Sequence, residues 1–230
     1  MFVIPCRYNP EHKFIYDLVK DIREYHPIEK IVIVDSDSAD KSYFELSSMY
    51  DNVEVLDVAN KNYHVGAYWI AYNTYPDEEF YYFLHDSMRV KTNLDYLKDK
   101  DFTAFAHFVF CGGGDVAKSE IEKYTPYKVP ASGHAIAGPC FFVKNFIMKT
   151  FKGKGVDKIL PTFSQHSDVK IGVAAYAVEG SYGIFFQNEG YNIVQNSLIG
   201  DITQRGVNHT TPNYDSSWMY PIEKLLAKRK

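Results

Sequence analysis

The chain has 230 residues, of which 46% are hydrophobic and 23% are charged. This length and balance fit one globular α/β domain and argue against a disordered chain. The formal net charge of −4 argues against a general nucleic-acid binder, which needs a basic surface to release counterions. No apolar run approaches the roughly 20 residues of a membrane-spanning helix, so we expect no transmembrane segment.

The three cysteines, Cys6, Cys111 and Cys140, are few and widely spaced. They fit neither a disulfide framework nor a zinc site, and they indicate a reducing compartment. The chain enters an apolar segment at Phe2 without a charged segment before it, so we expect no signal peptide. We predict a cytoplasmic protein. The short basic end at residues 225–230 is predicted to be a solvated helix terminus, and peripheral contact with a membrane or a continuation into further domains are the alternatives.

Aromatic residues make up 16% of the chain, with 19 Tyr and 16 Phe. Tyrosine joins an apolar ring to a polar tip, which suits clefts that hold sugars or bases. A core that is rich in aromatic side chains explains the same composition, and the sequence leaves both interpretations open.

Predicted strands and helices alternate through the first ninety residues. Apolar residues at helical spacing, such as Ile15, Leu18 and Ile22, predict helices, and short apolar runs predict strands. The strands are expected at residues 2–5, 30–34, 53–58 and 80–84, and the helices at 11–25, 42–50 and 67–75. The unbroken β-branched run in the second strand is typical of burial on both faces. The pattern predicts an α/β, Rossmann-like fold with a central, mostly parallel sheet flanked by helices.

The second half of the chain is less regular. Strands are expected at residues 102–110, 136–143 and 182–186, and helices at 145–151 and 168–178. The segment from 188 to 220 is polar, with scattered His, Asn and Asp residues.

Acidic residues follow two of the predicted strands directly. Asp35 and Asp37 follow the strand at 30–34, and Asp86 follows the strand at 80–84, between His85 and Ser87. Because ligands bind outside the carboxyl ends of the strands in open α/β sheets, we predict a binding site there. A divalent cation on a diphosphate prefers such hard oxygen ligands. The other interpretation is a strand end that merely carries polar residues.

Common phosphate-loop and hydrolase motifs are absent from the sequence. The glycine run at 112–114 lacks the Lys-Ser/Thr of a Walker loop, and Gly66 does not belong to a G-x-G-x-x-G motif. No G-x-S-x-G elbow is present, which disfavours a serine hydrolase.

The order of elements resembles the GT-A glycosyltransferases, the class that uses nucleotide-sugar donors. The likeness rests on the opening strand at 2–5, Asp35 after the second strand, Asn62 and Gly66 before an Ala-containing helix, and the polar strand end at 85–87. The family has an Asp-x-Asp motif at that last place, where this chain has one acid. The likeness covers residues 2–90 well and the rest loosely.

This resemblance implies one glycosyltransferase-like domain over 1–230, with a nucleotide-binding half at 1–90 and an acceptor-binding half and tail at 91–230. It implies transfer of a sugar from a nucleotide-diphosphate sugar, with UDP favoured, to a glycan or another hydroxyl acceptor, assisted by Mn²⁺ or Mg²⁺. The stereochemical course, retaining or inverting, stays open.

The resemblance also implies roles for particular residues. The donor-binding residues are Pro5, Arg7, Asp35, Asp37, Gly66, His85 and Ser87. Asp86 and His209 are implied as metal ligands, with His85 as a ligand or as a neighbour of the diphosphate. Asp168 is implied as the catalytic base of an inverting enzyme. Asp168 as a helix cap and His209 as a surface residue are the alternatives.

Two other functions stay open at this stage. A nucleotidyltransferase uses a similar sheet, but its phosphate loop normally contains glycine, and residues 6–10 contain none. A non-catalytic module that binds carbohydrate or nucleotide sugar is compatible with the incomplete Asp-x-Asp motif.

Overall fold

The computed structural model describes residues 1–110, 114–161, 171–201 and 221–224. These residues form two compact units. The first unit holds residues 1–99 and the short strand β10 (Ile222–Lys224), and the second holds the described residues from Lys100 to Asp201. Among the described helices, none combines the length and apolar character that crossing a membrane requires.

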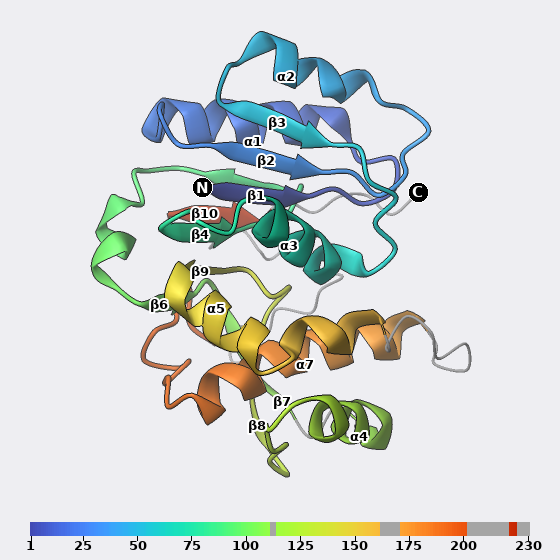
Figure 1. Cartoon of the computed structure of the whole chain (residues 1–230). Coiled ribbons are helices and arrows are strands. Elements are labelled where there is room, and N and C mark those ends of the chain that lie inside the picture. The colour runs from blue at the N-terminus through green and yellow to red at the C-terminus, as the bar shows by residue number, and fades with distance from the viewer. Residues whose placement is uncertain (111–113, 162–170, 202–220, 225–230) are drawn as a thin grey trace. The chain divides into compact units, whose positions relative to one another are not determined.

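Four parallel strands form the sheet of the first unit, in the order β3-β2-β1-β4. They are β1 (Phe2–Pro5), β2 (Ile31–Val34), β3 (Val53–Leu56) and β4 (Phe80–Phe83). Every residue of β1, β2 and β4 is buried, as expected for strands that are covered on both faces. The arrowheads of β1, β2 and β3 point to the same edge in Figure 1, so their following loops meet there.

Helices lie on both sides of these strands, with α3 in front and α1 behind in Figure 1. They are α1 (His12–Tyr25), α2 (Leu46–Met49), which follows a turn of 3₁₀ helix at Ser42–Glu45, and α3 (Tyr63–Thr74). Helix α1 buries Ile15, Leu18 and Ile22, as their spacing predicts. Helix α3 packs on β1 and β2 and begins at Tyr63, four residues before the predicted start.

An ion pair connects α1 to the next strand, β5 (Met88–Val90). Arg89 donates from Nη2 to Asp21 Oδ1 at 2.7 Å and from Nε to Oδ2. Strand β5 pairs in antiparallel fashion with β10 and is followed by a 3₁₀ turn at Asp95–Asp99.

The second unit contains two antiparallel strand pairs with four described helical segments. The strands are β6 (Phe102–Ala104) with β9 (Phe141–Lys144), and β7 (His107–Phe110) with β8 (Gly133–Ile136). The helical segments are α4 (Gly114–Tyr124), α5 (Asn145–Gly153), a 3₁₀ turn at Val156–Lys158 and α7 (Ile171–Asn188).

Three strand predictions in this unit were wrong. The single strand expected at 102–110 is interrupted between β6 and β7, and the strand expected at 136–143 spans parts of β8 and β9. The strand expected at 182–186 lies inside α7, which packs against β8. A short apolar run does not distinguish a strand from a buried helix, and Tyr182 and Phe186 are buried here as helix residues.

The aromatic residues largely fill the cores of the two units. Tyr43, Tyr68 and Tyr82 are fully buried in the first unit. In the second unit Phe102 stacks on Phe186 with ring centroids 3.7 Å apart. The core interpretation therefore accounts for much of the aromatic content.

Candidate functional site

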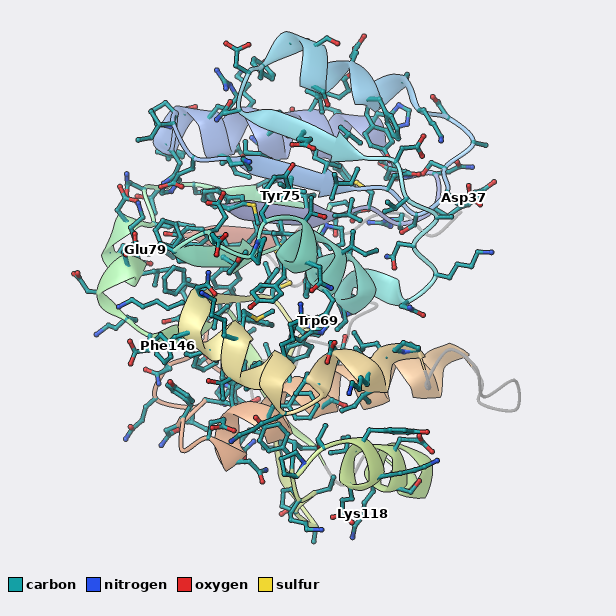
Figure 2. All side chains as sticks on the ribbon, viewed as in Figure 1. Asp37, Trp69, Tyr75, Glu79, Lys118 and Phe146 are labelled. Carbon is teal, nitrogen blue, oxygen red and sulfur yellow. The ribbon has the colours of Figure 1, made fainter. Side chains whose placement is uncertain are left out.

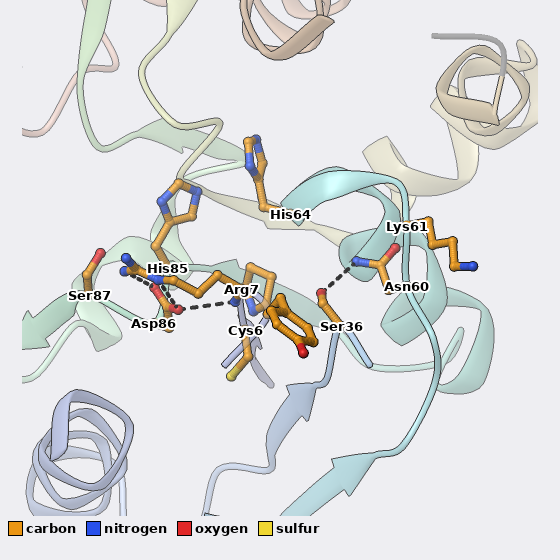
Figure 3. A pocket seen from close by; sticks show the side chains of 11 residues that line it. Cys6, Arg7, Ser36, Asn60, Lys61, His64, His85, Asp86 and Ser87 are labelled. Atoms are coloured by element: carbon orange, nitrogen blue, oxygen red, sulfur yellow. Dashed lines mark hydrogen bonds and ion pairs between the residues drawn. The ribbon is translucent and has the colours of Figure 1, made fainter. Parts of the chain in front are cut away.

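A cavity of about 490 Å³ lies at the edge of the first unit where the parallel strands end (Figure 3). Its lining comes from the segments that follow β1, β2, β3 and β4. The lining residues are Pro5, Cys6, Arg7, Tyr8, Ser36, Asn60, Lys61, His64, His85, Asp86 and Ser87. Strand order reverses between β1 and β4, because the chain moves outward through β2 and β3 and then returns to the other side of β1. Ligands of open α/β sheets bind at such a reversal.

Arg7 and Asp86 form an ion pair across this reversal. Arg7 donates from Nε to Asp86 Oδ2 and from Nη2 to Oδ1, both at 2.9 Å, and its backbone N–H lies 3.2 Å from Oδ2. The Asp86 side chain is 8% exposed, whereas that of Arg7 is 45% exposed. The hydrogen bonds to Asp86 raise the pKa of Arg7 above its usual value. Asp86 is therefore the buried partner of this pair, and Arg7 is the partner that reaches the surface.

The thiol of Cys6 is an unreactive part of the cavity wall. Burial, together with the negative charges of Asp86 and Asp35, raises the pKa of Cys6 well above its usual value. A thiol with a raised pKa is largely protonated at neutral pH, so it is a weak nucleophile.

Asp35 is buried and supports the loop after β2, and it is not among the cavity-lining residues. Its carboxylate accepts hydrogen bonds from the Tyr43 hydroxyl and, at 3.0 Å, from the backbone of Ser38. Burial acts to raise the pKa of Asp35, but these hydrogen bonds outweigh burial and lower it. Asp37 lies exposed on the same loop (Figure 2), with a left-handed φ of 63°.

Asn9 connects the loop after β1 to the loop after β2. Its backbone N–H donates to Ser38 Oγ at 3.1 Å, and its side-chain oxygen accepts from the backbone of Ala39 at 2.9 Å. Asn9 has a left-handed φ of 46°, a conformation that asparagine tolerates better than most residues.

Gly66 acts through packing and does not line the cavity. A Cβ atom at this position would lie 2.5 Å from both Asn60 Oδ1 and Asn62 Cβ, which leaves no room for a side chain. Because Gly66 has no side chain, Asn60 fits against it and places its amide 3.5 Å from Oγ of Ser36, in the loop after β2 (Figure 3).

Two histidines meet at the cavity, one from each side of the sheet reversal. His85 follows β4 and His64 lies in the first turn of α3, and their ring centroids are 4.8 Å apart. His85 was predicted as a site residue, but His64 was missed.

Sequence reasoning also missed Cys6, Tyr8, Ser36, Asn60 and Lys61. The rule that selected Asp35 and Asp86, polar residues after a parallel strand, also selects the loop after the third strand. Of the predicted residues, Pro5, Arg7, His85, Asp86 and Ser87 come together in the cavity. Asp168 and His209 lie outside the described residues.

The described residues do not fit a divalent metal held by Asp86. Both carboxylate oxygens already accept hydrogen bonds from Arg7. Within the part of the chain that the structure describes, no three His, Cys, Asp or Glu side chains are arranged to hold a metal ion. A cation that bound Asp86 would compete with these hydrogen bonds and would lie beside the positive charge of Arg7.

Comparison with known proteins shows the fold. No known protein family and no curated protein sequence matches the chain. Among solved structures, the chain is similar to the galactosyltransferase LgtC in complex with donor and acceptor sugar analogs, with 12% identity and a TM-score of 0.55. That likeness covers 100% of this chain and 88% of LgtC. It confirms the predicted α/β, GT-A-like fold class.

Weaker likenesses extend to two longer proteins. GalNAc-T7 with UDP, GalNAc and Mn²⁺ is 14% identical, with a TM-score of 0.43, over 63% of this chain and 35% of that chain. S. aureus TarS 1-349 is 18% identical, with a TM-score of 0.42, over 71% of this chain and 54% of that chain. The matched region therefore spans about a third of the GalNAc-T7 chain and about half of the TarS chain.

Proposed function

We propose that the chain is a glycosyltransferase that moves a sugar from a nucleotide-diphosphate sugar to a hydroxyl acceptor. The observation that carries this proposal is the cavity at the strand-order reversal, where the described lining residues include two cationic side chains, Arg7 and Lys61, and one carboxylate, Asp86. The fold shared with LgtC, whose structure holds donor and acceptor sugar analogs, supports the same class.

The residues that line the cavity suit the parts of such a donor. Arg7 offers its remaining guanidinium N–H groups to the diphosphate, and Lys61 adds a second positive charge. Their positive charge stabilises the negative charge that develops on the nucleotide diphosphate when its bond to the sugar breaks. Ser36 and Asn60 offer a hydroxyl and an amide to the ribose or the base. Asp35 acts indirectly, because it fixes the loop that carries Ser36.

The proposal assigns donor binding to the first unit and acceptor binding to the second. UDP is the favoured nucleotide because of the resemblance to the GT-A class. Asp168 stays the proposed base and His209 a proposed site residue. Asp37 stays a proposed contact of the base or ribose. The expected assistance by Mn²⁺ or Mg²⁺ does not fit Asp86 as the structure has it, so no step is assigned to a metal.

Nucleotide release tests this proposal. The full chain is incubated with UDP- and GDP-sugars, with simple glycan acceptors, and with either EDTA or Mn²⁺. Release of one nucleotide that increases with acceptor is the expected result. Asp86, the one acid among the described lining residues, is already paired, which also favours a non-catalytic binding module that would bind a nucleotide sugar and release nothing. Release of pyrophosphate from a nucleoside triphosphate and a sugar phosphate would support a nucleotidyltransferase.

A further inference from the structure

We infer that Arg7, held by Asp86, takes the place of a divalent cation on the donor diphosphate, so that nucleotide binding at this site needs no metal. This inference rests on the proposed function and deepens it, because it names the charge that faces the diphosphate.

The Asp86 carboxylate is already hydrogen-bonded to Arg7. Three donors lie on it, namely Nε, Nη2 and the backbone N–H of Arg7. A carboxylate offers about four lone-pair sites, and Asp86 is only 6% exposed as a residue. Few lone-pair sites of the Asp86 carboxylate therefore remain for a metal ion that requires direct oxygen ligands.

Arg7 is placed at the cavity with part of its guanidinium unbound by Asp86. A guanidinium has N–H groups on three nitrogens, and Asp86 accepts from two of these in one plane. Arg7 is nearly half exposed and lines the cavity, so its remaining N–H groups lie at the cavity wall. A planar fork of this kind matches two phosphate oxygens at once.

Arg7 is also held in place before a ligand binds. The backbone N–H and the side chain of Arg7 bind the same carboxylate, which fixes the arginine before a ligand arrives. A group that is already fixed loses less conformational entropy on binding. In this arrangement Asp86 is a positioning residue, and Arg7 is the residue that contacts the diphosphate.

Calorimetric titration with UDP and GDP, in EDTA and in Mn²⁺, tests the inference on the full chain. We expect one nucleotide to bind with an affinity that differs by less than about threefold between EDTA and Mn²⁺. Arg7→Met should weaken that binding by roughly tenfold or more, because a charge-assisted bidentate contact is lost. Arg7→Lys should restore part of the affinity, because it keeps the charge without the fork.

Asp86→Asn should weaken binding less than Arg7→Met does, because the amide keeps one acceptor for the arginine. A matched control is Arg89→Met, which removes the arginine of the other pair, Arg89 with Asp21, neither of which lines the cavity. We expect its UDP affinity to be unchanged. Circular dichroism and thermal melting of each variant show whether it has folded.

The outcomes separate the inference from the function on which it rests. Binding that requires Mn²⁺, that is lost in Asp86→Asn and that persists in Arg7→Met overturns the inference and leaves the transferase proposal standing. The absence of nucleotide binding under every condition, in a chain that melts cooperatively, overturns both.

Discussion

Among the described residues of the first unit, two arginine–aspartate pairs share the same two-nitrogen contact and differ in their surroundings. Arg7 and Asp86 are 79 residues apart in the chain, and Arg89 and Asp21 are 68 apart. In both pairs the guanidinium binds the carboxylate through Nε and Nη2. In both pairs the acid is largely buried and the arginine is partly exposed.

The surroundings give the two pairs different uses. Arg89 also lies 3.7 Å from Asp17, which in turn binds Lys13 at 2.5 Å, so positive and negative charges balance between α1 and β5. Arg7 lies on a loop beside a cavity, where Lys61 adds positive charge. Among the described residues, the Arg7 pair is the one that lies beside a cavity with a further positive charge, and this setting suits it to an anionic ligand.

The largest expected effect concerns the pair between α1 and β5. Asp21→Ala leaves Arg89 without its bidentate partner in a partly buried position, so the free energy of unfolding should fall by about 2–3 kcal/mol. Urea denaturation measures this change. The affinity for UDP should stay the same, and a large loss of affinity in a folded variant would contradict the division of roles.

Asp35 is a third buried acid of the first unit, and its hydrogen-bond donors are neutral. Tyr43→Phe removes the hydroxyl that binds Asp35 and should lower the free energy of unfolding by about 1–2 kcal/mol at pH 7. The folded-state pKa of Asp35 is lowered, so its stabilising contribution is present above the unfolded pKa of about 3.9 and is lost as the pH falls through the folded value.

The difference in stability between the native chain and Tyr43→Phe should therefore shrink below about pH 4. Denaturation series at several pH values measure this difference. A constant difference down to pH 2, roughly two units below the reference pKa of an aspartate, would show that the hydroxyl acts through packing and not through the charge of Asp35.

Asp86→Ala should cost less stability than Asp21→Ala, about 1 kcal/mol, because water in the cavity can solvate the released Arg7. The same urea titrations measure this difference. Equal losses in the two variants would show that the cavity pair is as important to folding as the pair on α1.

The smallest expected effect is at Lys61, whose side chain is exposed at the cavity. Lys61→Ala removes one screened charge and should weaken UDP binding by about threefold, with little change in stability. The loss should become smaller at high salt, because salt screens exposed charges. Calorimetry at two salt concentrations checks this, and a loss that does not depend on salt would argue for a direct hydrogen bond.

Much of the first unit could be predicted from the sequence, because its strands are short apolar runs between helices of clear spacing. The acids at the ends of β2 and β4 followed from the same pattern. The pairing of Asp86 with Arg7 could not be predicted, because alternation does not reveal that β1 and β4 are neighbours. The interaction crosses strands, and local sequence carries no signal for it.

The second unit was harder for a physical reason. Helix α7 is rich in apolar and small residues, so its sequence lacks the polar face that distinguishes a surface helix. Gly183 resembles a helix-breaking residue within α7, but a Cβ atom at this position would lie 1.9 Å from the carbonyl oxygen of His134. Gly183 allows α7 to pack closely against β8. Because β8 is distant in the sequence, the segment around Gly183 does not reveal this contact.

The contacts of Asn9 have a consequence for protein engineering. Asn9 binds Ser38 and Ala39, so the loops after β1 and β2 depend on each other's sequence. Mutant libraries that randomise only one of these loops would discard substitutions that succeed only when the other loop changes with them. A mutant library of these loops should therefore vary Asn9 and Ser38 together, with glycine included at position 9, where the left-handed backbone favours it.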